Sequence, residues 1–262
     1  FSIAPDSADG NIGDAVRPFV GSLTADGRSV RFRLNLAIVQ GAAVARVDSG
    51  DLMVITGRGV ARLEARAENA QLAPDTAGSL TRVVRLRGVV PRLDLDAART
   101  EDTLTSLNQT IALVAVARTL GGAAIPSVPI TWRQVSGGAI VVLEDSTVGR
   151  VRAVANGVAQ FEAYVDGVTA RRPVRVRQVP TSLTTPDSLR LRSLGQTAQL
   201  AATVRDALGS GIANAAPVWT ALDPAVATVN SAGQVRSVAN GAARIEARVG
   251  TIADTTRVTV AQ

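Results

Sequence analysis

Apolar and charged residues alternate strictly near the C-terminal end of the chain, in the stretch "ARIEAR" at residues 243–248. Ala243, Ile245 and Ala247 take every second position, and charged residues take the positions between them. A period of two places successive side chains on opposite faces of a β-strand. We therefore expect the apolar residues to face a core and the charged residues to face water.

The same alternation occurs twice more, in "ARLEAR" at 61–66 and in "AQFEAY" at 159–164. In each copy the inner positions hold a small, a large and again a small apolar residue. Such a strand can pack closely against a second sheet. The three copies predict three β-sandwiches along the chain.

Longer repeats support this division. The heptapeptide "VRAVANG" at 151–157 returns as "VRSVANG" at 235–241, and "SLNQTIAL" at 106–113 returns as "SLGQTAQL" at 193–200. A weaker copy relates "AVARVDS" at 43–49 to "AVATVNS" at 225–231. We expect domains at residues 1–89, 90–178 and 179–262, the first of them with a divergent or rebuilt front half.

The repeated heptapeptide predicts a turn and not a ligand site. Asn-Gly tolerates the positive φ angles of a tight turn. A phosphate-binding loop would need a helix after it, whereas a strand pattern follows. Short joints at Val90-Pro91 and Val179-Pro180 predict a semi-rigid rod, because proline stiffens the chain.

The last repeat, with "PVWTALDPAVATVNSAGQVRSVANGAARIEARV", resembles the bacterial Ig-like domain group 2 (BIG2) family. The resemblance is clearest over 180–262, weaker over 91–178 and partial over 43–66. It implies an all-β protein of three tandem immunoglobulin-like β-sandwich domains and an extracytoplasmic location (periplasm or cell surface). It also implies that Trp132 and Trp219 are equivalent core anchors, and it brings no catalytic residue.

Composition narrows the chemistry. The 262 residues include no Cys and no His, and only 3% are aromatic. Disulfides, thiol catalysis, most transition-metal sites and the usual general base near neutral pH are therefore excluded. We expect no enzyme activity, cofactor, metal site or small-molecule substrate, and no specific nucleic-acid binding because stacking residues are scarce. No apolar run is long enough to span a membrane, and the start at Phe1 predicts that any signal peptide has been removed.

Two groups of carboxylates are candidate sites. Asp6, Asp9 and Asp14 do not have the spacing of a calcium loop, so we expect an ordinary polar turn. A second group follows the first joint and would need burial for acid–base chemistry, whereas we expect it to be solvated. Its members are Asp94, Asp96, Glu101 and Asp102.

Arginines are the remaining candidates. The net charge is +6, and all 28 basic residues are arginine. Those on the last strands of units one and two are expected on the wet face of each strand. They either protect sheet edges from pairing or dock on an acidic partner. The partner-contact candidates are Arg82, Arg85, Arg87, Arg171, Arg175 and Arg177.

These features favour a non-catalytic accessory subunit that binds the periplasmic face of a larger membrane protein assembly, with a respiratory or photosynthetic complex as one candidate. The alternative is a fragment of a cell-surface adhesin or filament. A glycan-binding module would need exposed aromatic residues, and Tyr164 is the one outward candidate. We expect the strongest partner contact in residues 1–42, and an ordered polar stretch at 67–80 would indicate burial against a partner.

Overall fold

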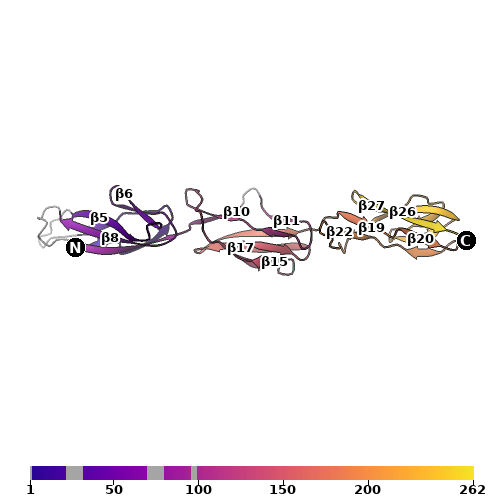
Figure 1. The fold of residues 1–262 in the computed structure, drawn as a ribbon, viewed down its shortest axis with the longest axis horizontal. Helices are drawn as coiled ribbons and strands as arrows, with labels where there is room; N and C mark the ends of the chain where they lie inside the picture. Colours follow the sequence, from indigo (N-terminus) through magenta and orange to yellow (C-terminus); the bar gives the residue numbers. More distant parts are fainter. Residues whose placement is uncertain (1, 22–31, 70–79, 96–98) are drawn as a thin grey trace.

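The structure is a computed structural model that describes residues 2–21, 32–69, 80–95 and 99–262. Strands and turns make up this part of the chain, and it contains no helix, hence none that could cross a membrane. The expectation of an all-β fold is confirmed. Figure 1 shows three groups of strands following one another along one axis, with the two ends of the chain at opposite ends of the row.

The described strands fall into three consecutive sets, called units one, two and three below. Unit one has β1 (Ser2–Ala4), β2 (Ser7–Asn11), β3 (Ala15–Val16), β4 (Phe19–Gly21), β5 (Phe32–Gln40), β6 (Ala45–Asp48), β7 (Leu52–Ile55), β8 (Gly59–Asn69) and β9 (Leu80–Val89). Unit two has β10 (Arg92–Leu95), β11 (Asp102–Leu104), β12 (Thr110–Ala112), β13 (Ala115–Arg118), β14 (Thr131–Ser136), β15 (Val141–Asp145), β16 (Arg150–Ala153), β17 (Gly157–Val165) and β18 (Val168–Val176). Unit three has β19 (Ser182–Thr184), β20 (Ser188–Leu191), β21 (Thr197–Gln199), β22 (Thr203–Arg205), β23 (Val218–Ala221), β24 (Ala227–Val229), β25 (Gln234–Ser237), β26 (Gly241–Val249) and β27 (Ile252–Val260).

All three units have the same strand order. Unit one contains a pair β1-β4, a four-stranded sheet β2-β9-β8-β5 and a three-stranded sheet β3-β7-β6. The pairs β10-β13 and β19-β22, the sheets β11-β18-β17-β14 and β20-β27-β26-β23, and the sheets β12-β16-β15 and β21-β25-β24 repeat this arrangement. The expectation of a rebuilt front half in unit one is therefore wrong at the level of topology, although its sequence differs there.

The front of unit one carries a repeat that the sequence comparison overlooked. "PDS" at 5–7 recurs at 186–188. In both places the serine begins a strand that pairs in parallel with the last strand of its unit, Ser7 with Arg85 and Ser188 with Arg257. In the three units β2, β11 and β20 each form one edge of the four-stranded sheet, by parallel pairing with the last strand of the unit.

The alternating stretches form the central strands of the cores, as expected. Their inner residues, Ala61, Leu63, Ala65, Ala159, Phe161, Ala163, Ala243, Ile245 and Ala247, are at most 2% exposed. Burial of alternate residues on both facing sheets is what holds a sandwich together. Each unit thus has its own apolar core.

The two tryptophans are equivalent but not equally buried. Trp132 lies opposite Ala163 and Trp219 opposite Ala247, each beside a glycine with positive φ whose missing Cβ leaves room for the indole, Gly149 and Gly233. Trp132 is 4% exposed, whereas Trp219 is only half-buried. The expected burial of both is therefore right for unit two and only partly right for unit three. In unit one Leu36 takes the same place, opposite Ala65.

The repeated heptapeptide forms a turn, but its asparagine acts differently from the expectation. Gly157 and Gly241 adopt φ angles of 145° and 146°, while neither asparagine has positive φ. Instead, the side-chain oxygen of Asn156 accepts a hydrogen bond of 2.8 Å from the main-chain N–H of Gln178. Asn240 accepts the equivalent bond, 3.0 Å long, from Gln262. The asparagine therefore fixes the chain as it leaves the last strand of a unit.

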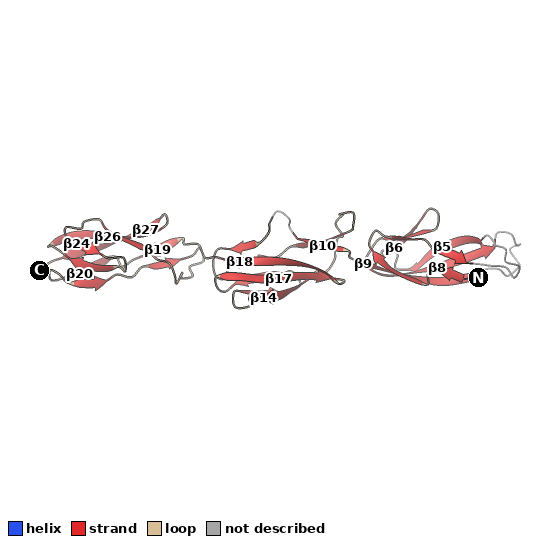
Figure 2. Cartoon of the chain, turned by 180° about the vertical axis from the view of Figure 1, so that it is seen from behind, coloured by secondary structure: helices blue, strands red, loops and turns tan. Residues whose placement is uncertain are grey.

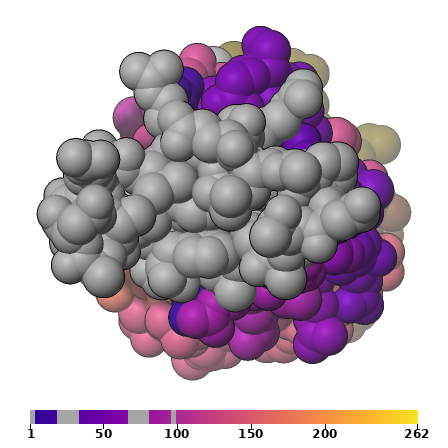
Figure 3. All heavy atoms as spheres, turned by 90° about the vertical axis from the view of Figure 1, so that its left-hand side faces the viewer, coloured from indigo at the N-terminus to yellow at the C-terminus, as the bar shows by residue number. Residues whose placement is uncertain are grey.

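The units form an extended row and not a compact cluster. The view from behind shows the same order of units along the axis (Figure 2). In the view along the axis, units one and two overlap and little of unit three appears beyond them (Figure 3). The described part of the molecule is thus a narrow rod.

The unequal burial of the tryptophans leads to a stability prediction. Trp132→Ala should lower the free energy of unfolding of unit two by about 3–5 kcal/mol, the usual cost of emptying a large buried aromatic site. Trp219→Ala should cost about half as much, because part of its surface already contacts water. Denaturant unfolding followed by circular dichroism measures both losses. The tryptophan left in each variant reports the untouched unit by fluorescence, and equal losses would contradict the difference in burial.

Candidate functional site

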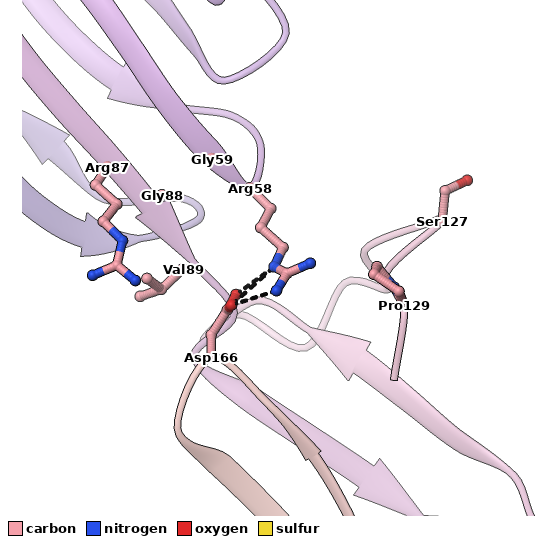
Figure 4. Close-up of a pocket in the computed structure, with 8 residues that line it drawn as sticks. All are labelled: Arg58, Gly59, Arg87, Gly88, Val89, Ser127, Pro129 and Asp166. Carbon is pink, nitrogen blue, oxygen red and sulfur yellow. Dashed lines mark hydrogen bonds and ion pairs between the residues drawn. The ribbon is translucent and has the colours of Figure 1, made fainter. Parts of the chain in front are cut away.

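The first candidate site is joint one, the contact between units one and two. Asp166 lies in the turn between β17 and β18, with φ of 48°. Its carboxylate accepts hydrogen bonds from Nε of Arg58 at 2.8 and 2.9 Å and from the main-chain N–H of Val90 at 3.1 Å. Arg58 belongs to the turn between β7 and β8 of unit one, and Figure 4 shows its guanidinium directed at Asp166. One carboxylate of unit two thus binds both the end of unit one and the linker.

The ion pair at joint one is asymmetric. The side chain of Asp166 is 9% exposed, and that of Arg58 is 40% exposed. The hydrogen bond from Arg58 lowers the pKa of Asp166 below its ordinary value, and partial burial opposes this effect only in part. The same hydrogen bond raises the pKa of Arg58. Both groups are therefore charged across the neutral and mildly acidic range.

A shallow pocket of about 410 Å³ opens beside this ion pair. Ser127 and Pro129 form the wall opposite Arg58 in Figure 4. Asp166 is the one carboxylate among the lining residues, and it is already bonded to Arg58 and Val90. A hard cation needs several oxygen ligands, so the chemistry of this pocket fits a structural contact and not a metal site.

Joint two connects units two and three through a different aspartate. Asp206, 2% exposed, follows β22. Its Oδ2 accepts hydrogen bonds from the main-chain N–H of Leu107 at 2.9 Å and from Nε2 of Gln178 at 2.8 Å. Its Oδ1 accepts bonds from the N–H groups of Leu208 and Ser210 in its own loop. A single carboxylate therefore orders a loop of unit three and binds unit two.

Burial alone would raise the pKa of Asp206. The hydrogen bonds from Gln178 and from three main-chain N–H groups outweigh burial and hold the pKa below its ordinary value. A buried carboxylate that accepts four hydrogen bonds is stable as the anion. Joint two therefore has no unsatisfied charge at neutral pH.

The two joints share one position of the preceding unit, that of Val90 and Gln178. β8 and β17 both begin with glycine, so Arg58 stands where Asn156 stands. Gly59 pairs with Gly88 and Gly157 pairs with Val176, so Val90 corresponds to Gln178. The same exit region of units one and two therefore receives a carboxylate of the next unit.

The carboxylates themselves come from different loops. Gly250 occupies the turn position of Asp166 in unit three, with a similar φ of 57°. Thr119 occupies the position of Asp206 in unit two, where it orders its loop by accepting a hydrogen bond from Ala123. Between units two and three, each carboxylate is thus present only in the unit whose joint uses it. The joints are specific pairings and not copies of one contact.

The six arginines proposed as partner contacts divide into two groups. Four form ion pairs inside their own unit: Arg82 with Asp6, Arg87 with Asp9, Arg171 with Glu162 and Arg175 with Glu101. The guanidinium groups of the other two, Arg85 and Arg177, contact no carboxylate of the described residues. The structure does not gather the six into one surface.

Arg82 was expected on the solvent-facing side of its strand, and the structure places it on the other side. Arg82 lies on the same side of β9 as the buried Val84, opposite Ala65, and meets Asp6 at 3.5 Å. In unit two Arg172, which aligns with Val84, lies on the same inner side of β18, is 4% exposed and meets Asp102 at 3.5 Å. In both units an arginine at the inner phase of the last strand meets the aspartate that precedes or begins the parallel strand.

Glu162 was expected to face water, and the structure corrects this expectation. Nε of Arg133 donates to it at 2.7 Å and Nε of Arg171 at 2.9 Å, so the side chain is only 3% exposed. The hydrogen bonds from Arg171 and then Arg133 lower its pKa. Arg133 also lies 5.7 Å from the ring centroid of Tyr164. A carboxylate bridged by arginines from two neighbouring strands covers this face of unit two.

The other carboxylate candidates are mostly paired within the fold. Asp14 accepts a hydrogen bond from Asn11 in a turn, as expected, whereas Asp9 lies within strand β2 and not in a turn, so the expectation is wrong for Asp9. Asp94 binds Arg92 and Arg118, contrary to the expectation of a solvated group. Within the described ranges no cluster of three acidic residues is placed to hold a metal ion. Asp96 and residues 70–79 lie outside the described residues, so the expectations about them stay predictions.

Sequence reasoning missed the residues of both joints. The aspartate of joint one is visible when "YVDGVT" of unit two is aligned with "RVGTIA" of unit three, because glycine stands at its place in unit three. The aspartate of joint two is visible when "VRDALGSG" of unit three is aligned with "ARTLGGAA" of unit two, because threonine stands at its place in unit two. The signal is therefore a carboxylate present in one repeat and absent from the other at an aligned turn.

Comparison with known proteins agrees with the Ig-like resemblance. Residues 184–260 match the family described as bacterial Ig-like domain (group 2), as expected for the last repeat. A comparison with curated proteins gives no match. The described chain is similar to domains 4 and 5 of the S-layer protein SbsC, at 19% identity and a TM-score of 0.32, over 65% of this chain and 97% of that one.

Other structural similarities are also to tandem arrays. The I-band fragment of titin matches at 10% identity and a TM-score of 0.46, over 97% of this chain and 95% of the fragment. Mouse cadherin-23 matches at 11% identity and a TM-score of 0.34, over 97% and 94%. Against the longer structure of SbsC domains 1–6, the chain spans 40% of the matched protein. The strand order repeated in the three units shows a tandem array of β-sandwiches, and its last unit matches the bacterial Ig-like domain (group 2) family over residues 184–260.

Proposed function

We propose that the chain is a non-catalytic, extracytoplasmic structural protein, a stiff three-unit rod that holds its two ends apart as part of a cell-surface or adhesion protein. The observation that carries this proposal is the carboxylate at each joint. Asp166 and Asp206 each bind the preceding unit and so oppose bending at both places where the rod could flex. The proposed units are residues 1–89, 90–178 and 179–262.

Bending would break charge-assisted contacts. A hydrogen bond to a charged group contributes about 1.5–3 kcal/mol when it is shielded from water and less when it is exposed. Joint two is well shielded, because Asp206 is 2% exposed. Joint one is more solvated, since Arg58 is 40% exposed. Joint two is therefore the stiffer of the two.

The repeat architecture supports the location and class in this proposal. The last unit matches the bacterial Ig-like domain (group 2) family, and the resemblance to that family implies a surface or secreted array. A rod with its ends far apart fits a spacer. Whether it works in the periplasm or at the cell surface depends on what its ends join.

An accessory subunit docked on a larger membrane assembly is the second candidate, as the sequence first suggested. One observation favours it. Exposed arginines on unit one, Arg62 and Arg85, have no carboxylate partner among the described residues. A docked partner would supply one.

The rod is tested by measuring the distance between units one and three. The chain lacks cysteine, so spin labels can be attached at Ala42→Cys and Ser231→Cys, both exposed sites. We expect a narrow distance distribution that Asp206→Asn widens. The asparagine oxygen keeps the loop bonds from Leu208 and Ser210, while its NH₂ group opposes the donors of Leu107 and Gln178.

The matched control is Asp48→Asn, which removes an equal charge and an ion pair of 2.9 Å with Arg46 inside unit one. It should leave the distribution unchanged. A broad distribution in the unmodified protein, or equal widening by Asp48→Asn, would contradict the proposal.

Acid should loosen joint one in a defined window. Because the pKa of Asp166 is lowered in the folded joint, its contribution is fully present above the ordinary carboxyl pKa of about 4 and is lost as the pH falls below it. Labels on units one and two should therefore give an unchanged distribution down to about pH 4 and a wider one below. Asp166→Asn should already be wide at neutral pH and respond far less to acid. Widening above about pH 5 would show that another group controls the joint.

A further inference from the structure

Two arginines face each other on the outer surface of the four-stranded sheet in units one and three. Arg62 of β8 is directly opposite Arg85 of β9, and Arg244 of β26 is directly opposite Arg257 of β27. All four are exposed, and the residues beside them along each strand are buried in the cores. The pairs therefore occupy the same place on the outward faces of two units.

Such a pairing is unfavourable by itself. Like charges directly opposite each other on neighbouring strands destabilise a sheet. In the described part of the chain, none of these four guanidinium groups has a hydrogen bond or an ion pair. Unit two has Gln160 opposite Pro173 at this place, so the sandwich does not require arginines there. The repulsion between opposed arginines therefore occurs in two units and does not stabilise either of them.

The neighbouring strands add hydrogen-bonding side chains to each pair. Ser7 of β2 lies beside Arg85, and Ser188 of β20 lies beside Arg257. In unit one Gln40 of β5 also lies beside Arg62, so the row Ser7, Arg85, Arg62 and Gln40 crosses the sheet. Strands lie about 4.8 Å apart, which makes the row roughly 14 Å wide. Every member can donate hydrogen bonds, and none is an anion.

Unit two shows that two arginines on the outward face of a sheet can hold one carboxylate. On its outer face Arg133 of β14 and Arg171 of β18 hold the carboxylate of Glu162, which lies on the strand between them. Glu64 is at the corresponding place of unit one but faces Ala37 and Val83, and Glu246 of unit three faces Thr220 and Thr255. Units one and three therefore keep the glutamate but lack its two flanking arginines. Their own arginine pairs lie two residues away along the strands, where no carboxylate of the described residues is bonded to them.

We propose that these arginine rows bind glutamate or aspartate side chains of an acidic polypeptide segment that lies across the sheet. The molecule's own example of the contact is a glutamate, and guanidinium groups bind carboxylates through paired hydrogen bonds. Two rows on one rod allow a single partner to bind at both, which raises its overall affinity.

Unit one provides the stronger row. In unit three Arg244 and Arg257 line a shallow pocket of about 530 Å³ that Asp187 and Asp223 also line. These carboxylates weaken the local attraction for an anion. In unit one Asp6, the equivalent of Asp187, is already paired with Arg82, and Gln40 lies beside Arg62.

The test is binding of a fluorescent oligoglutamate peptide, followed by anisotropy at low and at physiological salt. Arg62→Gln with Arg85→Gln should weaken binding about tenfold, the effect of losing two partly solvated arginine–carboxylate contacts. Arg244→Gln with Arg257→Gln should weaken it less. The matched control is Arg46→Gln with Arg82→Gln, which removes the same charge from unit one at arginines that already have carboxylate partners. It should change binding less than about twofold.

A second variant gives a readout that does not depend on loss of charge alone. Arg85→Glu should form an ion pair with Arg62, imitate the Glu162 arrangement, raise the melting temperature and abolish peptide binding at unit one. A lowered melting temperature of Arg85→Glu would overturn the proposal, because the pair would then have a structural role.

Other outcomes would also overturn it. These are an absence of oligoglutamate binding, or equal losses for the Arg62/Arg85 variant and its control, which would show a general charge effect. Binding of polygalacturonate or of phosphatidylglycerol vesicles as tight as that of the peptide, and equally dependent on Arg62 and Arg85, would assign the surface to a polysaccharide or a membrane. None of these results bears on the stiffness of the rod.

Discussion

A carboxylate between two main-chain or side-chain donors is the interaction on which the extended shape depends. Each Ig-like unit buries its own apolar core, so nothing in the cores determines how one unit is oriented on the next. Val90 follows the last strand of unit one, and Leu107 lies in the loop between β11 and β12 of unit two, so neither N–H group has a strand partner. Asp166 accepts from Val90 and Asp206 accepts from Leu107, so these donors stay satisfied only in one orientation. Because an unpaired buried donor is energetically costly, these hydrogen bonds restrict the angle between neighbouring units.

The three units differ in whether the arginines on their outward sheet faces are paired with carboxylates. Unit two neutralises its arginines internally through Glu162, whereas units one and three leave a pair of arginines opposed. An internal carboxylate makes a stable, closed surface. An absent carboxylate leaves a surface that gains from an anionic partner. The middle of the rod thus serves shape, and its two outer units carry the surfaces suited to contacts.

Much of the fold could be predicted from local patterns. The alternation in "ARIEAR", "ARLEAR" and "AQFEAY" identified the central strands because one face of each is buried completely. The role of Asn156 could not be read from its neighbours, since it binds Gln178 at the far end of a hairpin. Arg58 and Asp166 are 108 residues apart, and their contact depends on how two finished units meet. The arginine pairs required the strand register, because a shift of one residue would have turned every side chain to the other face.

The repeated heptapeptide also has a genetic consequence. Nearly identical stretches at 151–157 and 235–241 are natural points for unequal crossing-over between gene copies. One such event would join residue 157 to residue 242 and delete a repeat while preserving the strand order of the hybrid unit. The hybrid would carry the hairpin of β26 and β27, with Gly250 at the position of Asp166. Its core would be complete, yet it could no longer hold Arg58, so a shortened protein would fold and still lose its alignment with unit one.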